Sequence, residues 1–195
     1  MRTLIPFIIT LLSCNLAMAK EPQARGSIYA IVPLLSINWP LKGDVGGIGA
    51  FGVGLNYTWR NRLYVGAQTA AWAHFVDDLG KTYDLSVGYS LNLNTNKAAS
   101  WLVNVVPQVG YRYAKRWYYY RDGFGPENRS HGVLAGASYE FYQNKAIGFV
   151  IRAHTLFEWA PYSVITENNI GAEFDEHVYV AGVDLGLSVG LSFGH

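Results

Sequence analysis

The sequence predicts an all-β fold, a transmembrane eight-stranded antiparallel up-and-down β-barrel, in a chain of 195 residues. Apolar residues recur at every second position over segments of about ten to fourteen residues, which is the signature of strands. The intervening positions hold small and polar residues, and no lysine lies in the middle of such a segment. Together, these observations indicate strands with one face toward lipid and the other toward a narrow interior.

The composition excludes several other classes of protein. Hydrophobic residues make up 50% of the chain and aromatic residues 15%, whereas only 15% are charged, so the chain is not of the disordered type. A formal net charge of +1 provides no basic field for nucleic acid. Cys14 is the single cysteine, which rules out an internal disulfide.

The first residues have the features of a secretory signal peptide. Arg2 precedes an apolar stretch from Leu4 to Ser13, and Ala17-Met18-Ala19 supplies the small-x-small pattern that signal peptidase accepts. The apolar stretch is shorter than the roughly 17–25 residues of a transmembrane helix. We therefore expect a signal peptide over residues 1–19, an outer-membrane β-barrel domain over 20–195, and export to the cell outer membrane.

The last segment of the chain shows which face meets lipid. Its apolar face is formed by Tyr179, Ala181, Val183, Leu185, Leu187, Val189, Leu191 and Phe193, and its other face by Val180, Gly182, Asp184, Gly186, Ser188, Gly190 and Ser192. A soluble barrel is apolar inside and presents a polar surface to water. Here the polar face is mostly Gly, Ser, Thr and Asn, as a narrow lumen requires. The apolar face is therefore expected to lie outside, against lipid.

The alternation defines eight strands and the joins between them. The strands are expected at residues 27–38, 47–59, 62–74, 80–93, 100–113, 131–143, 146–159 and 177–193. The joins at 60–61, 94–99 and 144–145 are short, and those at 39–46, 114–130 and 160–176 are longer, with 75–79 as a modest exception. Short periplasmic turns and longer extracellular loops are typical of outer-membrane barrels. Both termini are then expected in the periplasm.

The mature chain resembles the small eight-stranded outer-membrane barrels, such as the transmembrane domain of OmpA, OmpX and OmpW. The resemblance rests on the strand pattern and on the final strand, where Leu191 and Phe193 look like the C-terminal signal read by the barrel-assembly machinery. In that family an aromatic residue usually ends the chain, whereas here Gly194 and His195 follow Phe193. The resemblance implies a monomeric barrel in contact with outer-membrane lipids and lipopolysaccharide.

The lumen of an eight-stranded barrel is just wide enough for side chains, which favours a plugged interior. Parity places six charged residues inside it: Asp84, Arg112, Glu140, Arg152, Glu158 and Asp184. Buried charges have to be paired, and one planar guanidinium group can serve two carboxylates. We therefore expect a network centred on Arg112 and Arg152. A gated proton or ion path is the alternative.

Histidines near the expected outer rim raise the possibility of an enzyme. Some barrels of this size are lipid A deacylases or palmitoyltransferases, which use a His with a Ser and an acid near the outer leaflet. The candidates here are His131, His154 and Glu158, with Ser130 and Ser163 as possible nucleophiles. No spacing matches the motif of either family. Neither a catalytic residue nor a metal or cofactor is therefore assigned.

A segment of cations and aromatic residues follows the fifth expected strand. It consists of Lys115, Arg116, Trp117, Tyr118, Tyr119, Tyr120 and Arg121. Tyr and Trp favour the headgroup level of a membrane, and Arg and Lys attract lipid phosphates. We expect this segment to contact lipopolysaccharide headgroups.

The sequence thus predicts an integral outer-membrane barrel of structural or surface-interaction type with a plugged polar lumen. The alternatives are a lipid A-modifying enzyme, either a deacylase or an acyltransferase, and a small channel. No cofactor and no nucleic-acid partner are expected.

Overall fold

The computed structural model describes residues 24–32, 37–42, 47–73, 79–94, 99–120, 123–166, 173–174 and 180–194. The expected signal peptide lies outside these residues, and so does His195. Within the described part, no helix is long and apolar enough to cross a membrane. The described elements are β1 (Arg25–Ile31), β2 (Ile37–Lys42), β3 (Gly47–Ile48), β4 (Ala50–Thr58), β5 (Leu63–Ala73), β6 (Leu79–Tyr89), β7 (Leu91–Asn92), β8 (Trp101–Tyr120), β9 (Gly123–Gln143), β10 (Ile147–Thr166), β11 (Glu173–Phe174) and β12 (Val180–Gly194).

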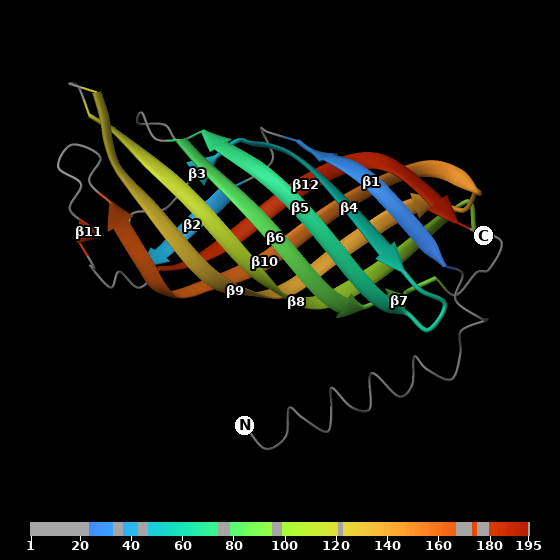
Figure 1. Cartoon of the computed structure of the whole chain (residues 1–195). Coiled ribbons are helices and arrows are strands. Elements are labelled where there is room, and N and C mark those ends of the chain that lie inside the picture. Colours follow the sequence, from blue (N-terminus) through green and yellow to red (C-terminus); the bar gives the residue numbers. More distant parts are fainter. Residues whose placement is uncertain are drawn as a thin grey trace, which may run out of the picture.

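The strands form a closed eight-stranded antiparallel barrel, as the sequence predicted (Figure 1). Three of the eight wall strands are each described in two pieces: β1 with β2, β3 with β4, and β6 with β7. Around the wall, β4, β5, β6, β8, β9 and β10 pair in that order, and β12 pairs with both β10 and β1 to close the circle. Within the described residues, the short β11 pairs with the extension of β10.

One interruption has a plain cause in the sequence. The gap between β6 and β7 lies opposite the part of β8 that carries Pro107, because Gly88 pairs with Gln108 and Leu91 pairs with Val105. Proline has no backbone N–H, so a ladder hydrogen bond is missing at this point. The wall nevertheless continues through β7 in the same register.

The expected long join at 114–130 is wrong, because β8 and β9 continue through it as a paired ladder. Lys115 pairs with Arg129, and the pairing reaches Tyr120 and Gly123, with residues 121–122 outside the described part. The ladder shifts register between Trp117 and Tyr119, opposite Pro126, and a bulge is one of the few places where a strand accepts proline. Charge and proline favour a loop in the sequence, but both occur here within paired strands.

The expected join at 160–176 is corrected in the same way, since β10 runs on to Thr166 and pairs there with β9 and β11. Its register shift lies between Trp159 and Tyr162 and includes Pro161. We name the end of the barrel that carries the β8–β9 hairpin the hairpin end. The opposite end, with Arg25 and Gly194, is named the terminal end (Figure 1).

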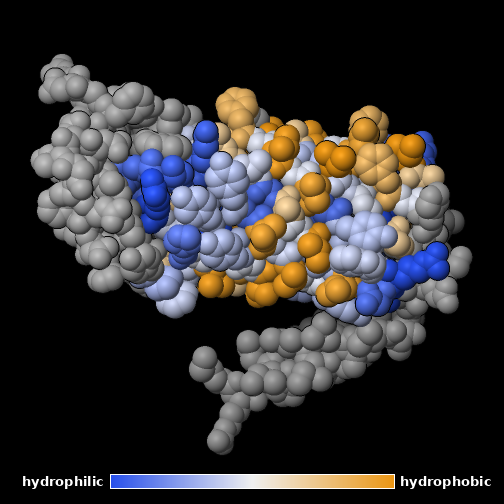
Figure 2. Space-filling model, viewed as in Figure 1, coloured by the Kyte–Doolittle hydropathy of each residue, from blue (hydrophilic) through white to orange (hydrophobic). Residues whose placement is uncertain are grey.

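The outer wall is apolar, and the polar positions point inward. Figure 2 shows apolar residues spread over the middle of the wall, with hydrophilic residues toward the ends. The large apolar residues exposed on the wall include Phe51, Leu55, Leu85, Val109, Phe149 and Leu191. By contrast, Asp84, Arg112 and Asp184 are buried in the lumen. The hydrophobic pattern is thus the reverse of a soluble protein, as the sequence predicted.

We predict that Val109→Arg destabilises the barrel by about 2–4 kcal/mol, because Val109 lies on the outer wall near the middle of β8 and a cation there would sit in the hydrocarbon region. The measurement is reversible denaturant unfolding in lipid vesicles. The matched control, Val109→Leu, keeps the site apolar and should change stability little. Equal stability of the two variants would contradict the orientation of the wall.

Candidate functional site

The lumen holds the charged residues that the sequence placed there, and Arg112 lies among three carboxylates. The Arg112 Nε and Nη2 atoms donate to the two oxygens of Asp84 at 2.7 Å each. Nη1 donates to Glu158 Oε2 at 2.9 Å, and Nη2 also donates to Asp184 Oδ2 at 2.6 Å. The four side chains are fully or nearly fully buried. One guanidinium fork on β8 thus ties together β6, β10 and β12.

Arg152 on β10 occupies a second, less densely charged environment. Its Nη2 donates to Ser138 Oγ at 2.7 Å and its Nη1 to Gln68 Oε1 at 3.3 Å. Its Nε lies 3.9 Å from Glu140 Oε1, and its guanidinium carbon lies 5.0 Å from the centre of the Tyr29 ring. Arg152 is therefore held mainly by neutral groups, unlike Arg112.

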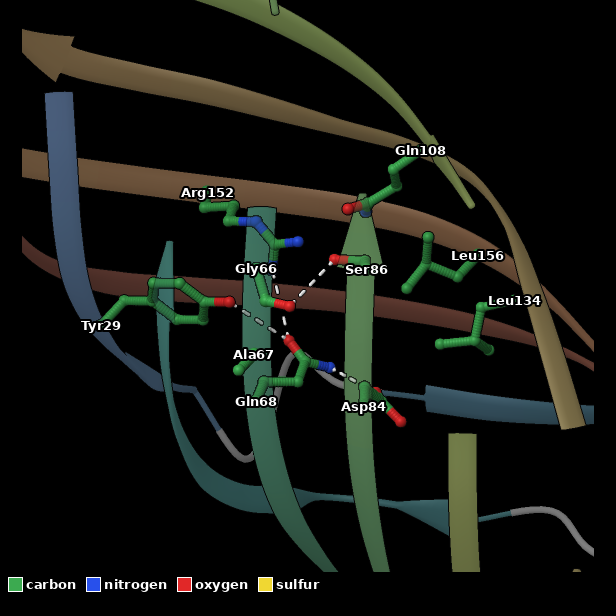
Figure 3. Close-up of a pocket in the computed structure, with 10 residues that line it drawn as sticks. All are labelled: Tyr29, Gly66, Ala67, Gln68, Asp84, Ser86, Gln108, Leu134, Arg152 and Leu156. Atoms are coloured by element: carbon green, nitrogen blue, oxygen red, sulfur yellow. Dashed lines mark hydrogen bonds between the residues drawn. The ribbon is translucent and has the colours of Figure 1, made fainter. Parts of the chain in front are cut away.

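The two arginine environments are connected through Gln68 (Figure 3). Its side-chain amide donates to Asp84 Oδ2 at 2.9 Å, while its carbonyl accepts from Arg152. Glu140 is held from the far wall, because Asn56 Nδ2 donates to its Oε1 at 2.8 Å and Ser27 Oγ donates in turn to Asn56 at 2.7 Å. Asn56 and Ser27 were not predicted as members of this network, although their parity places them on the polar face.

These bonds span the lumen instead of following the wall. In the order of the wall, Asn56 on β4 and Glu140 on β9 are four strands apart, as are Gln68 on β5 and Arg152 on β10. In a barrel of eight strands, two strands that are four positions apart lie on opposite sides of the lumen. Beside these side chains is a cavity of about 10 Å³, room for roughly one water molecule. It is lined by Tyr29, Gly66, Ala67, Gln68, Asp84, Ser86, Gln108, Leu134, Arg152 and Leu156 (Figure 3).

A small apolar cluster lies inside the barrel on the hairpin side of the network, on β1, β4 and β5. Ile31, Ala50, Ala70 and Trp72 form a buried cluster there. The Trp72 indole N–H donates to Thr82 Oγ1 at 3.4 Å, which provides its single polar atom with a partner inside the barrel. The network thus has a buried apolar cluster on its hairpin side, along one part of the wall.

The structure separates the histidine candidates. His154 points into the lumen, with its Nε2 3.5 Å from Asp184 Oδ1, and its ring packs where a Cβ on Gly186 would come within 2.4 Å. His131 lies on the outer wall, where its Nδ1 is hydrogen-bonded to the Tyr111 hydroxyl. Glu158 binds Arg112. The three residues therefore do not meet in one site.

Other expected functional residues are placed as follows. Leu191 and Phe193 point outward at the terminal end of β12, exposed on the wall. Lys115 to Tyr120 belong to β8, whereas the side chains of residues 116–121 lie outside the described part. Among the described residues, no group of three or more His, Cys, Asp or Glu side chains is arranged to hold a metal ion.

Solved structures with similar folds are outer-membrane barrels. The N-terminal β-barrel domain of Pseudomonas aeruginosa OprF shares 11% identity at a TM-score of 0.51, covering 89% of this chain and all of that domain. Ail, the attachment invasion locus protein of Yersinia pestis, shares 17% identity at 0.52, covering 89% of this chain and 100% of its own. Neisserial surface protein A shares 10% identity at a TM-score of 0.52, covering 88% of this chain and 97% of its own.

No protein-family model and no curated protein matches the chain. The likeness to OprF, Ail and the neisserial protein therefore concerns architecture. The fold is that of the small eight-stranded outer-membrane β-barrels, the class that the strand pattern predicted.

We predict that Arg112→Ala destabilises the barrel by about 3–5 kcal/mol, because it leaves three buried carboxylates without their shared cation. Arg152→Ala should have a smaller effect, about 1–3 kcal/mol, since most of its partners are neutral. Lys145→Ala, in an exposed turn, is the control and should change stability by less than about 0.5 kcal/mol. Denaturant unfolding in detergent or lipid ranks the stability of the three variants. If Arg112→Ala and Arg152→Ala lost the same stability, Arg112 would not depend on its carboxylates more than Arg152 does.

Proposed function

We propose that this protein is an integral outer-membrane barrel of structural or surface-interaction type whose polar lumen is plugged. The observation that carries the proposal is the set of bonds across the lumen, from Asn56 to Glu140 and from Arg152 to Gln68, together with the Arg112 cluster. Side chains that bind one another across a narrow barrel occupy the space that a solute would need. The buried Trp72 side chain and its apolar neighbours occupy further space inside the barrel.

The proposed location and partners are inferred from the outer wall of the barrel. A belt of exposed apolar residues around the barrel requires a lipid surrounding, and the solved barrels with similar folds are outer-membrane proteins. Export through the signal peptide at 1–19 and folding by the barrel-assembly machinery, with Leu191 and Phe193 as its signal, belong to the same proposal. Outer-membrane lipids and lipopolysaccharide are the proposed partners of the wall, and the barrel is proposed to act as a monomer.

The alternative of a lipid A-modifying enzyme finds little support in the positions of the histidines. A rim hydrolase needs a nucleophile, a base within about 2.6–3.2 Å of it, and an orienting acid. His131 is engaged by the Tyr111 phenol, and His154 is buried beside Asp184 in the lumen. The mass spectrum of lipid A from an expressing strain separates this alternative from the proposed function, because only an enzyme would change its acyl chains.

The plugged lumen is tested by recording conductance in a planar bilayer. We predict that the purified wild-type barrel produces no large, stable conductance step, because its lumen side chains bind one another across the interior. Circular dichroism and heat-modifiable mobility on gels confirm that the sample is folded. A large, regular conductance from folded wild-type protein would contradict the plug and favour the channel.

A further inference from the structure

Two buried side chains meet at one serine inside the lumen. Gln108 on β8 donates from its Nε2 atom to Ser138 Oγ at 2.7 Å, and Arg152 on β10 donates from its Nη2 atom to the same oxygen at 2.7 Å. All three side chains are buried. The shared hydroxyl group therefore fixes the orientation of both the carboxamide and the guanidinium group.

The remaining polar atoms of these two groups are an acceptor and a donor. Among the described residues, neither Gln108 Oε1 nor Arg152 Nε has a hydrogen-bond partner, and Glu140 Oε1 is 3.9 Å from that Nε. The Nε–H and the Nη2–H of a guanidinium group point to the same side, so the Nε–H faces the side on which Gln108 lies. Buried polar atoms in proteins are bonded to other protein groups or to ordered water.

The cavity in the lumen lies against both groups. Gln108, Arg152 and Ser86 line it, and in Figure 3 the Gln108 oxygen and the Ser86 hydroxyl point toward the Arg152 guanidinium group. Its volume of about 10 Å³ suits one water molecule and nothing larger. A buried water needs two to four polar partners. The donor of Arg152, the acceptor of Gln108 and the hydroxyl of Ser86 supply three.

A glycine on β5 leaves room beside this cavity, and hydroxyl groups surround that room. A Cβ added at Gly66 would lie 2.6 Å from the Tyr64 hydroxyl and 2.9 Å from Ser86 Oγ. Ser86 Oγ donates to the Gly66 carbonyl oxygen at 3.5 Å, which is long for a hydrogen bond. The Ser86 hydroxyl is therefore weakly engaged and can form a shorter bond to a molecule in the cavity.

We infer that the cavity binds one water molecule, which accepts a hydrogen bond from Arg152 Nε–H and donates to Gln108 Oε1, with Ser86 Oγ as its third partner. This water joins β10, β8 and β6 at the level where Gln68 and Asp84 connect the two arginine environments. The inference rests on the proposed plugged lumen and deepens it, because the plug then includes one solvent molecule as a fixed part. An open, water-filled lumen would instead hydrate both arginines.

Nuclear magnetic resonance of the detergent-purified protein tests the site, with water itself as the probe and isotope-labelled arginine side chains as reporters. We expect the Nε–H of Arg152 to show a direct nuclear Overhauser effect to water, and the loss of its signal in R152K assigns it. The Nε–H of Arg112 is the internal control. Because it donates to Asp84 Oδ1 at 2.7 Å, it should show no such effect.

Two variants of buried amides on β8 separate the water site from general packing of the lumen. Q108M keeps the length of the side chain and removes the acceptor, so the effect at Arg152 should fall at least threefold. N104L is the matched control, because Asn104 is also buried and donates to Ser90 Oγ at 2.9 Å, but it does not line the cavity. This variant should leave the effect at Arg152 unchanged. Circular dichroism and heat-modifiable mobility verify that each variant is folded.

Three results would overturn the inference: no effect at Arg152 in folded wild-type protein, an equal effect at Arg112, or an effect that Q108M leaves unchanged or that N104L reduces equally. The comparison of the two arginines in wild-type protein is informative even if a variant fails to fold. The conductance recording keeps the two proposals apart. If the barrel passes no large current and shows no water at Arg152, the site alone fails. A large conductance with water at both arginines would contradict the plugged lumen itself.

Discussion

A buried charge in a lumen too narrow for bulk water has to find its partner on another strand, and this requirement organises the interior of the barrel. Arg112 meets it with a planar fork that reaches carboxylates on β6, β10 and β12. Each of these carboxylates would be costly to bury alone. The position of Arg112 on β8 therefore constrains which residues the other three strands present at this level of the barrel.

Small residues on the lumen face leave the space that the large side chains of the interior occupy. An added Cβ at Gly186 would lie 2.4 Å from the His154 ring, and one at Gly54 would lie 2.4 Å from the Tyr29 ring. A large side chain from one strand thus fills the space that a glycine on the adjacent strand leaves open. The Gly- and Ser-rich face of the strands follows from this packing as much as from polarity, since Lys or Glu at the same positions would neither fit nor find partners.

Alternation along single strands was enough to predict the fold and the two faces of the wall, because the side-chain period of a strand fixes which face a residue joins. It was not enough to find which carboxylates Arg112 binds, because register depends on pairing between distant strands. The extensions of β8 and β10 were missed for a different reason. The alternation of apolar and polar residues is weaker in these extensions, so Arg129 and Pro161 are typical of loops in the sequence, although the ladder continues through or around them.

The most direct test of the account is a double-mutant cycle between Arg112 and its carboxylates. Arg112→Met keeps most of the packing volume and removes the charge, and it is measured in the wild type and in a D84N/E158Q/D184N background. If paired charge holds the lumen together, Arg112→Met should reduce the free energy of unfolding by at least about 2 kcal/mol more in the wild type than in the neutralised background. Additive losses, with the same reduction in both backgrounds, would contradict the central role of the Arg112 cluster.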